Sequence, residues 1–448
     1  MVKTVLWVAS VICLPLIVLR WSWSLKSIFS DLRASEVIFI HTHAINYGQG
    51  LMFIDAIRRV LSGKHVTVVL VWEPGGTQNT KLGRIFTDIS VRFLRSPFFL
   101  FSLFGKKFCL PEKTIGEPVL NKVTYWLFRI LTSGTEQRRI RDIYHNLPIP
   151  ADLSDVVPQD YMNHEDTQIP PQFYAHVLWG SSVAKGDPAP LPVMPEPEKS
   201  EIHEKLLQVR GGRMVKLCMM HNRVETHSDG KARDGSPMEA YLPAIRLLVD
   251  YGYQVMLCGD RTLEDEQFDD FSGMVVDARK LGVELDLFRL FAPIEADIVI
   301  GEGEGGMILP VIMDKPSIAF NVYGVVAMPG KWIYPKRATD ESGNPAPYKN
   351  VVEMDAYGYY VLQKKYAKAL VYHKNTQEEI CEGVKCFLED VEERGLGSDV
   401  GALEKEILDA IPLVSFFHVL GARFSPAFIC RDRQAQTAVE TQGNQGNN

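Results

Sequence analysis

The second half of the chain alternates unbroken apolar runs with amphipathic runs, and this alternation constrains the fold more than any other feature. Five short apolar runs predict strands at 214–221, 253–260, 273–278, 297–300 and 315–321. Helical spacing of apolar residues between them predicts helices at 238–252, 285–296 and 306–314. Strands that alternate with helices build parallel sheets. The pattern therefore predicts a doubly wound, Rossmann-like α/β domain.

The first half opens with the same unit, although less of it can be followed. A strand is predicted at 37–40, a helix from Leu51, and a second strand in "HVTVVLVW". The proline-rich stretch "DPAPLPVMPEP" is too stiff and too poor in donors for the interior of an element, so it predicts a domain boundary. We expect two Rossmann-like domains whose ligand loops face each other. The predicted segments are a Rossmann-like domain at 34–185, a linker at 186–209, a second Rossmann-like domain at 210–375, C-terminal helices at 376–430 and a disordered tail at 431–448.

Residues 1–30 have the character of a membrane-associated segment. Apolar or small residues fill the run from Thr4 to Leu19, which Lys3 and Arg20 flank. A bilayer-spanning helix needs about 20 apolar residues, so a short signal anchor and an interfacial helix both remain open. Basic residues after the run favour placing the rest of the chain at the cytoplasmic face of the plasma membrane, in contact with the inner leaflet. The stretch 91–108, where basic residues flank Phe and Leu, predicts either a core helix or a second interfacial helix.

Charge and cysteine content exclude several classes of partner. The chain of 448 residues has a net charge of −7, which gives no long-range attraction to nucleic acid. Its 7 cysteines include no CxxC pair, so neither a disulfide framework nor a zinc site is predicted. His41 and His43 lack a third metal ligand nearby. We expect no metal and no cofactor.

A glycine-rich turn, "GEGEGGMILP" at 301–310, lies between a predicted strand and a predicted helix. Free backbone N–H groups and the helix dipole make such a turn suitable for an anion. The carboxylates of Glu302 and Glu304 would repel a diphosphate placed directly on them. We therefore expect Gly305, Gly306 and the helix N-terminus to approach phosphate or sugar. One glutamate would accept hydrogen bonds from ribose or sugar hydroxyls, or both would merely favour the helix dipole.

Several motifs in order resemble a family of GT-B-like glycosyltransferases from bacterial surface-polysaccharide loci. The resemblance is carried by "CMMHNRVETHSDGKARDGSPMEAYLPAIRLLVDYGYQVMLCGD", "ADIVIGEGEGGMILPVIMDKPSIAFNVYGVVAMPGKWIYPKR" and "GARFSPAFI", and extends to "HTHAINYGQGLMFIDAIRR". It implies a nucleotide-sugar donor on the C-terminal domain. It also implies a lipid-linked or glycan acceptor on the N-terminal domain, and transfer without an obligatory metal.

Glycosyl transfer needs cationic or N–H groups to neutralise the leaving diphosphate. Arg223 follows the first strand of the C-terminal domain, where strand ends meet ligands in doubly wound sheets, and Arg233 follows in the next loop. These two arginines are the predicted diphosphate ligands. Gly259 and Asp260, after the second strand, are predicted to contact the nucleotide, although Asp260 could equally cap a turn.

A transferase also needs a base for the acceptor hydroxyl. The candidates are His221, at the end of the first C-terminal strand, together with His41 and His43. His221 could instead hydrogen-bond a phosphate or be purely structural. The predicted acceptor-side loop contains Asn46, Gly48 and Gly50, where glycines permit close approach of the backbone.

Three other functions remain open at this stage. A GT-B-like epimerase or hydrolase would keep the donor site and need no polymer acceptor. A membrane-anchored sugar-binding protein without catalysis would also fit. An NAD-dependent oxidoreductase is disfavoured, because no GxGxxG follows the first strand of either domain.

Overall fold

The protein divides into two compact units in a computed structural model of the chain. The first unit contains Met1–Leu147 and Pro188–Pro190, and the second contains Pro148–Asp187 and Leu191–Asn448. Each unit is described separately. The structure describes residues 19, 23, 26, 28–44, 47–72, 79–95, 99–103, 106–109, 136–139, 179, 189–223, 235–303, 305–322, 331–348, 351, 370–393, 404, 405, 407, 409 and 422–434.

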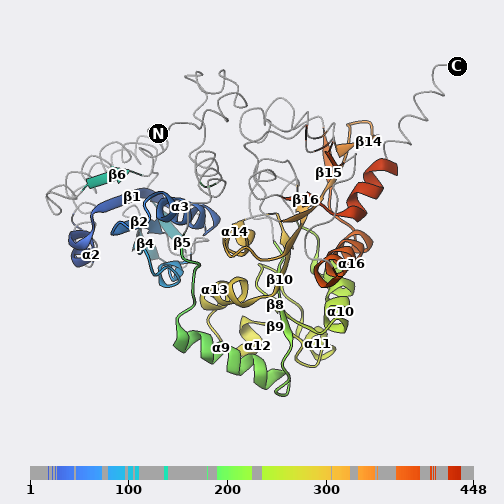
Figure 1. The fold of residues 1–448 in the computed structure, drawn as a ribbon, viewed down its shortest axis with the longest axis horizontal. Coiled ribbons are helices and arrows are strands. Elements are labelled where there is room, and N and C mark those ends of the chain that lie inside the picture. Colours follow the sequence, from blue (N-terminus) through green and yellow to red (C-terminus); the bar gives the residue numbers. More distant parts are fainter. Residues whose placement is uncertain are drawn as a thin grey trace. The chain divides into compact units, whose positions relative to one another are not determined.

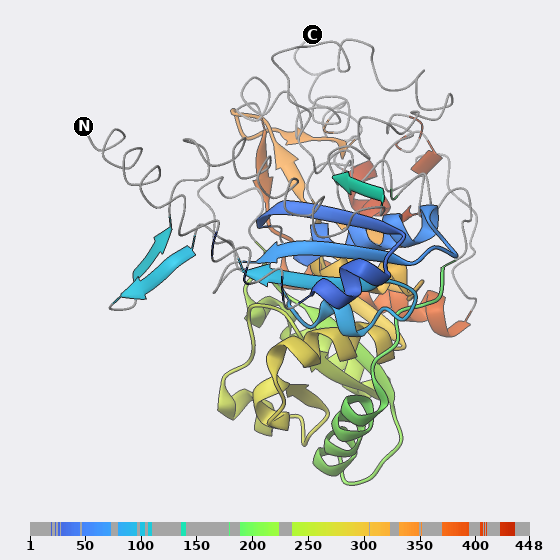
Figure 2. The same ribbon diagram turned by 90° about the vertical axis from the view of Figure 1, so that its left-hand side faces the viewer.

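A parallel four-stranded sheet forms the centre of the first unit, as Figure 2 shows in blue to teal. The strand order is β3-β2-β1-β6, and every neighbouring pair is parallel. Buried Val, Ile and Phe side chains line β1 and β2, and helix α3 packs on β2. The elements are α2 (Phe29–Ala34), β1 (Val37–Ala44), α3 (Tyr47–Val60), β2 (Val66–Trp72), η1 (Leu82–Arg84), β3 (Ser90–Arg95) and β6 (Glu136–Arg139).

Two predictions for this unit are wrong. Residues 91–108 form strands instead of a helix: β3 ends at Arg95, and β4 (Phe99–Leu103) pairs antiparallel with β5 (Lys106–Cys109). Phe and Val are good strand formers, so propensity favours strand over helix in this stretch. The predicted loop with Gly48 and Gly50 is also wrong, because both are buried in the first turns of α3.

Arg58 on α3 joins three parts of the first unit. It is 3% exposed and pairs with Asp55 at 3.0 Å and with Asp88 at 3.5 Å. Its guanidinium also donates to the carbonyl of Pro190 and lies 5.0 Å from the centre of the Phe86 ring.

We expect Arg58→Met to lower the free energy of unfolding by about 2 kcal/mol, because buried carboxylate charge loses a partner. Asp55 keeps its ion pair with Arg59, which limits the loss. Urea denaturation measures the change, and Lys64→Met at an exposed position is the matched control. Equal stability of the two variants would contradict a structural role for Arg58.

A parallel seven-stranded sheet forms the centre of the second unit. The order is β16-β12-β11-β10-β7-β8-β9, with parallel pairing throughout. All five predicted strands are present, and the predicted α/β class with parallel sheets is confirmed. The strands are β7 (Lys216–His221), β8 (Tyr253–Leu257), β9 (Val275–Asp277), β10 (Ile298–Glu302), β11 (Ser317–Val322), β12 (Trp332–Pro335) and β16 (Arg423–Phe424).

Helices cover both faces of this sheet (Figure 1). On one face lie α10 (Leu242–Asp250) and α16 (Gln377–Glu393); on the other lie α9 (Glu196–Val209), α12 (Ala278–Leu281), α13 (Leu285–Glu295) and α14 (Ile308–Ile312). Because both faces are covered, β8, β10 and β11 are buried at every position, which explains their unbroken apolar runs. Gly252 ends α10 with a φ of 84°, as its C-cap position predicts.

Smaller elements complete the second unit. A three-stranded antiparallel sheet has the order β14-β13-β15, and short helices precede or follow the strands of the main sheet. These elements are η2 (Met238–Tyr241), α11 (Asp265–Asp269), η3 (Gly305–Met307), β13 (Arg337–Thr339), β14 (Pro345–Ala346) and β15 (Val371–His373).

Two segment boundaries differ from those predicted. The expected linker 186–209 includes helix α9, which buries Ile202 and Leu206. Residues 431–434 continue a helix, and Asp432, buried in it, accepts a hydrogen bond from the Tyr348 backbone at 2.9 Å, so the expected tail does not begin at 431. The last proline of the run, Pro197, lies in the first turn of α9, where a helix tolerates proline, and apolar residues then recur at helical spacing.

The N-terminal membrane prediction concerns residues 1–30, most of which lie outside the described residues. Within the part of the chain that the structure describes, no helix is both long enough and apolar enough to span a bilayer.

Candidate functional site

The candidate site lies where the connections of the second unit's sheet change direction. The chain runs from β7 to β8 and β9 on one side, and then returns to place β10 on the other side of β7. Parallel pairing brings the carboxyl ends of β7 and β10 together, with His221 opposite Gly301. In doubly wound sheets, ligands bind outside the carboxyl ends of the strands at such a switch point.

His221 packs directly against the glycine-rich turn. A Cβ added to Gly306 would overlap the His221 imidazole, and one added to Gly301 would overlap the Met307 sulfur. A side chain at either position would therefore force His221 or Met307 to move. The structure brings together the predicted residues His221, Gly305 and Gly306, the last two in η3 and both partly exposed.

The loop after β8 is fixed to the loop after β7 by backbone contact. The Asp260 N–H donates to the Asn222 carbonyl at 2.8 Å. A Cβ on Gly259 would overlap the backbone of Asn222, so only glycine fits there. The Asp260 carboxylate accepts from Arg289 at 3.1 Å, and Arg289 also donates to the Cys258 and Gly259 carbonyls. Gly259 and Asp260 thus lie at the predicted edge, and Asp260 has a structural partner.

The Glu302 carboxylate accepts hydrogen bonds from the protein itself, whereas the sequence suggested that it accepts them from ligand hydroxyls. It is 2% exposed, and protein groups donate to both carboxylate oxygens. The Tyr241 hydroxyl donates to it at 2.9 Å, and burial next to this carboxylate raises the pKa of Tyr241 well above its usual range. Tyr241 therefore remains a protonated donor at neutral pH.

Arg223 is partly exposed, and its backbone N–H donates to Glu302 at 2.8 Å. This bond holds the Arg223 backbone against Glu302 in the glycine-rich turn. Arg233 and Glu304 lie outside the described residues, so their prediction stays open. Arg261 donates to the Ser236 carbonyl at 2.6 Å and brings another guanidinium to this edge.

The first unit places His41 and His43 in the last half of β1. β1 lies between β2 and β6, so its carboxyl end is also a switch point. The register with β2 shifts between His41 and Ala44, and strict alternation of faces therefore does not hold there. The side chains of both histidines, and all of Asn46, lie outside the described residues.

Sequence reasoning missed four residues that organise the site: Tyr241, Arg261, Arg289 and Asn321. Asn321 lies in the wholly buried strand β11 and donates to Glu302 at 2.9 Å. Its φ of 53° is uncommon for a residue with a side chain. In the sequence, only a polar residue between Phe320 and Val322 hints at this role. Within the described ranges, no three His, Cys, Asp or Glu side chains group closely enough to hold a metal ion.

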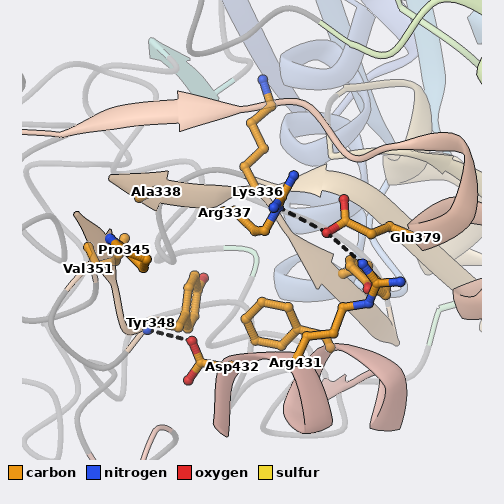
Figure 3. Close-up of a pocket in the computed structure, with 12 residues that line it drawn as sticks. Lys336, Arg337, Ala338, Pro345, Tyr348, Val351, Glu379, Arg431 and Asp432 are labelled. Atoms are coloured by element: carbon orange, nitrogen blue, oxygen red, sulfur yellow. Dashed lines mark hydrogen bonds and ion pairs between the residues drawn. The ribbon is translucent and has the colours of Figure 1, made fainter. Parts of the chain in front are cut away.

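A separate pocket of about 60 Å³ lies beyond the end of β12 (Figure 3). Arg337 and Arg431 both pair with the buried Glu379, at 3.0 and 3.2 Å. Ion pairing thus satisfies the two guanidinium groups within the protein. Pockets for drug-sized ligands measure about 300–1,000 Å³, so this volume is too small for a nucleotide.

No protein-family model and no curated protein matches this sequence. Among solved structures, the chain is similar to ADP-heptose lps heptosyltransferase II of E. coli, with 12% identity and a TM-score of 0.42 over 80% of this chain and 99% of that one. It is also similar to the E. coli heptosyltransferase WaaC with ADP-2-deoxy-2-fluoro heptose (14% identity, TM-score 0.34, 68% of this chain, 93% of that one). A third is the wall teichoic acid polymerase TagF (11% identity, TM-score 0.27, 86% of this chain, 92% of that one). These identities and TM-scores are too low to define an activity for this chain.

Proposed function

We propose that the protein is a metal-independent glycosyltransferase of the GT-B type that transfers a hexosyl or related glycosyl group from a nucleotide sugar. The observation that supports this most strongly is the meeting of Arg223, His221 and the Gly305–Gly306 turn at the switch point of the second unit's sheet. Doubly wound sheets bind nucleotides at this position. The motif resemblance to glycosyltransferases covers the same residues.

In this proposal the second unit binds the donor. Arg223 and the N–H groups of Gly305 and Gly306 would neutralise the leaving diphosphate, with Arg233 as a further cation. His221 would either hydrogen-bond a phosphate oxygen or take the proton from the hydroxyl group of the acceptor substrate. Gly259 and Asp260 would contact the nucleoside.

The first unit would bind a lipid-linked or glycan acceptor in cell-surface polysaccharide synthesis. His41 or His43, at the end of β1, would be the alternative base, and Asn46 would contact the acceptor. The two units would face each other across the reacting sugar, and residues 1–30 would hold the enzyme at the cytoplasmic face of the membrane.

Thermal melting with UDP-glucose, GDP-mannose, ADP-glucose and NAD tests the donor site. A ligand that binds only the folded protein stabilises it by about 2.7 kcal/mol at 100 times its dissociation constant. We expect a higher melting temperature with at least one nucleotide sugar and no change with NAD. Stabilisation by NAD alone would contradict glycosyl transfer. Binding of a nucleotide sugar with hydrolysis or isomerisation, and no transfer to membrane extracts, would indicate the epimerase or hydrolase alternative.

A further inference from the structure

The Glu302 carboxylate lies at the centre of a buried polar cluster at the end of β10. Its members, here called the Glu302 cluster, are Asn222, Ser236, Tyr241, Glu302 and Asn321. Three groups donate to Oε1 at 2.9 Å: the Ser236 backbone N–H, the Tyr241 hydroxyl and the Asn321 amide. The Arg223 backbone N–H donates to Oε2 at 2.8 Å. One carboxylate thus joins β10 to the ends of β7 and β11 and to the start of η2.

The same carboxylate binds both ends of the segment that carries the predicted diphosphate ligands. Arg223 precedes residues 224–234 and Ser236 follows them, and each donates its backbone N–H to a different oxygen of Glu302. Gly235 packs so closely on this carboxylate that an added Cβ would overlap it. The spacing of the two ends is therefore set by one side chain.

A second layer fixes Glu302 in turn. The backbone N–H of Asn321 donates to the Asn375 side chain at 2.6 Å, and the Asn375 N–H donates back to Asn321 at 2.8 Å. Asn321 adopts a left-handed φ of 53°, which costs a non-glycine residue about 1 kcal/mol. This backbone conformation allows its side-chain amide to reach Glu302. A strained, densely hydrogen-bonded network of this kind is typical of a site that must keep one geometry.

We infer that Glu302 is a positioning residue: by accepting hydrogen bonds from the backbone N–H groups of Arg223 and Ser236, its buried carboxylate positions Arg223 for binding of a nucleoside diphosphate, without touching the ligand. This inference rests on the proposed donor site. Glutamine at 302 has one acceptor oxygen and one NH₂ group. In either orientation its NH₂ would face an N–H of Arg223 or Ser236, so one end of the loop would lose its hydrogen bond.

The test compares Glu302→Gln with Glu404→Gln. Glu404 is also buried, at 6% exposure, and accepts the N–H of Phe424 in β16 at 3.0 Å, but β11 and β12 separate β16 from β10. Hydrogen–deuterium exchange of the free protein is followed in peptides that contain Arg223 and Ser236. We expect about tenfold faster exchange in Glu302→Gln and no change there in Glu404→Gln. Unchanged exchange in Glu302→Gln would overturn the inference.

Calorimetric titration with UDP, GDP and ADP separates positioning from general destabilisation. For the nucleotide that binds the wild type best, Glu302→Gln should weaken affinity about tenfold. The double variant with Arg223→Ala should bind within about twofold of Arg223→Ala alone, because Glu302 acts through Arg223. Additive losses would overturn the positioning role.

If Glu302→Gln does not fold, Glu302→Asp takes its place. Aspartate keeps the charge, but its side chain is one methylene shorter, so its oxygens lie farther from the two N–H groups. Hydrogen–deuterium exchange at Arg223 and Ser236 should therefore again increase. A folded Glu302→Asp with wild-type exchange would contradict the inference. If none of the three nucleotides binds the wild type, the proposed function fails, whereas the exchange measurement still reports on the Glu302 cluster.

Discussion

Replacing Arg223 with alanine is expected to weaken binding of the nucleoside diphosphate by about 10- to 100-fold, the largest loss of affinity for any single side chain of this site. A hydrogen bond to a charged group contributes about 1.5–3 kcal/mol, and about 1.4 kcal/mol corresponds to tenfold in affinity. The Arg223 residue is partly exposed at the carboxyl end of β7, and its backbone N–H donates to Glu302 of the glycine-rich turn. Calorimetric titration with the donor nucleotide measures the effect.

Arg246→Ala is the matched control for this experiment. It removes the same charge from an exposed position of α10, so the change in net charge is identical. We expect wild-type affinity in this control. If Arg223→Ala also binds like the wild type, Arg223 is not a diphosphate ligand.

Replacing Gly259 with alanine is expected to destabilise the second unit by about 4 kcal/mol. The added methyl group would overlap the backbone of Asn222, which cannot rotate away as a side chain could. Overpacking in a well-packed region costs about 1–3 kcal/mol, and the hydrogen bond from Asp260 to Asn222 would add about 1 kcal/mol when it breaks. A shift of the Asn222 backbone would also displace Arg223, which follows Asn222 in the chain.

Gly252→Ala provides the comparison for Gly259→Ala. Gly252 has a φ of 84° and no atom within 4 Å of an added Cβ, so its cost is left-handed strain alone, about 1–2 kcal/mol. Urea denaturation of both variants measures the difference. Equal destabilisation would mean that the loops after β7 and β8 are not held in close contact.

Strands β7 to β11 of the second unit were predictable because each carries an apolar run, buried at every position in β10 and β11. Strands β6, β12 and β16 escaped prediction. β6 has the polar sequence "EQRR", and β16 contains only Arg423 and Phe424. Both are recognisable only from their partners in the sheet, which the local sequence does not specify.

The position of the candidate site followed from the same reasoning, whereas its internal bonding did not. Parallel strands place their carboxyl ends at one edge, so residues after β7, β8 and β10 were expected to meet. The partners of Glu302 come from Tyr241 and Asn321, 61 and 19 residues away. No periodicity or motif links such distant polar residues. A glutamate in a glycine-rich turn therefore suggested ligand contact, although its hydrogen bonds are internal.

The structure of the protein with the bound nucleoside diphosphate tests the proposed donor site most directly. We expect the diphosphate within hydrogen-bonding distance of the Arg223 guanidinium and of the N–H groups of Gly305 and Gly306, with Glu302 still bonded to Arg223 and Ser236 and out of contact with the ligand. A nucleotide bound at the end of β1, or at the pocket beside Glu379, would contradict the assignment of the donor site to the switch point of the second unit.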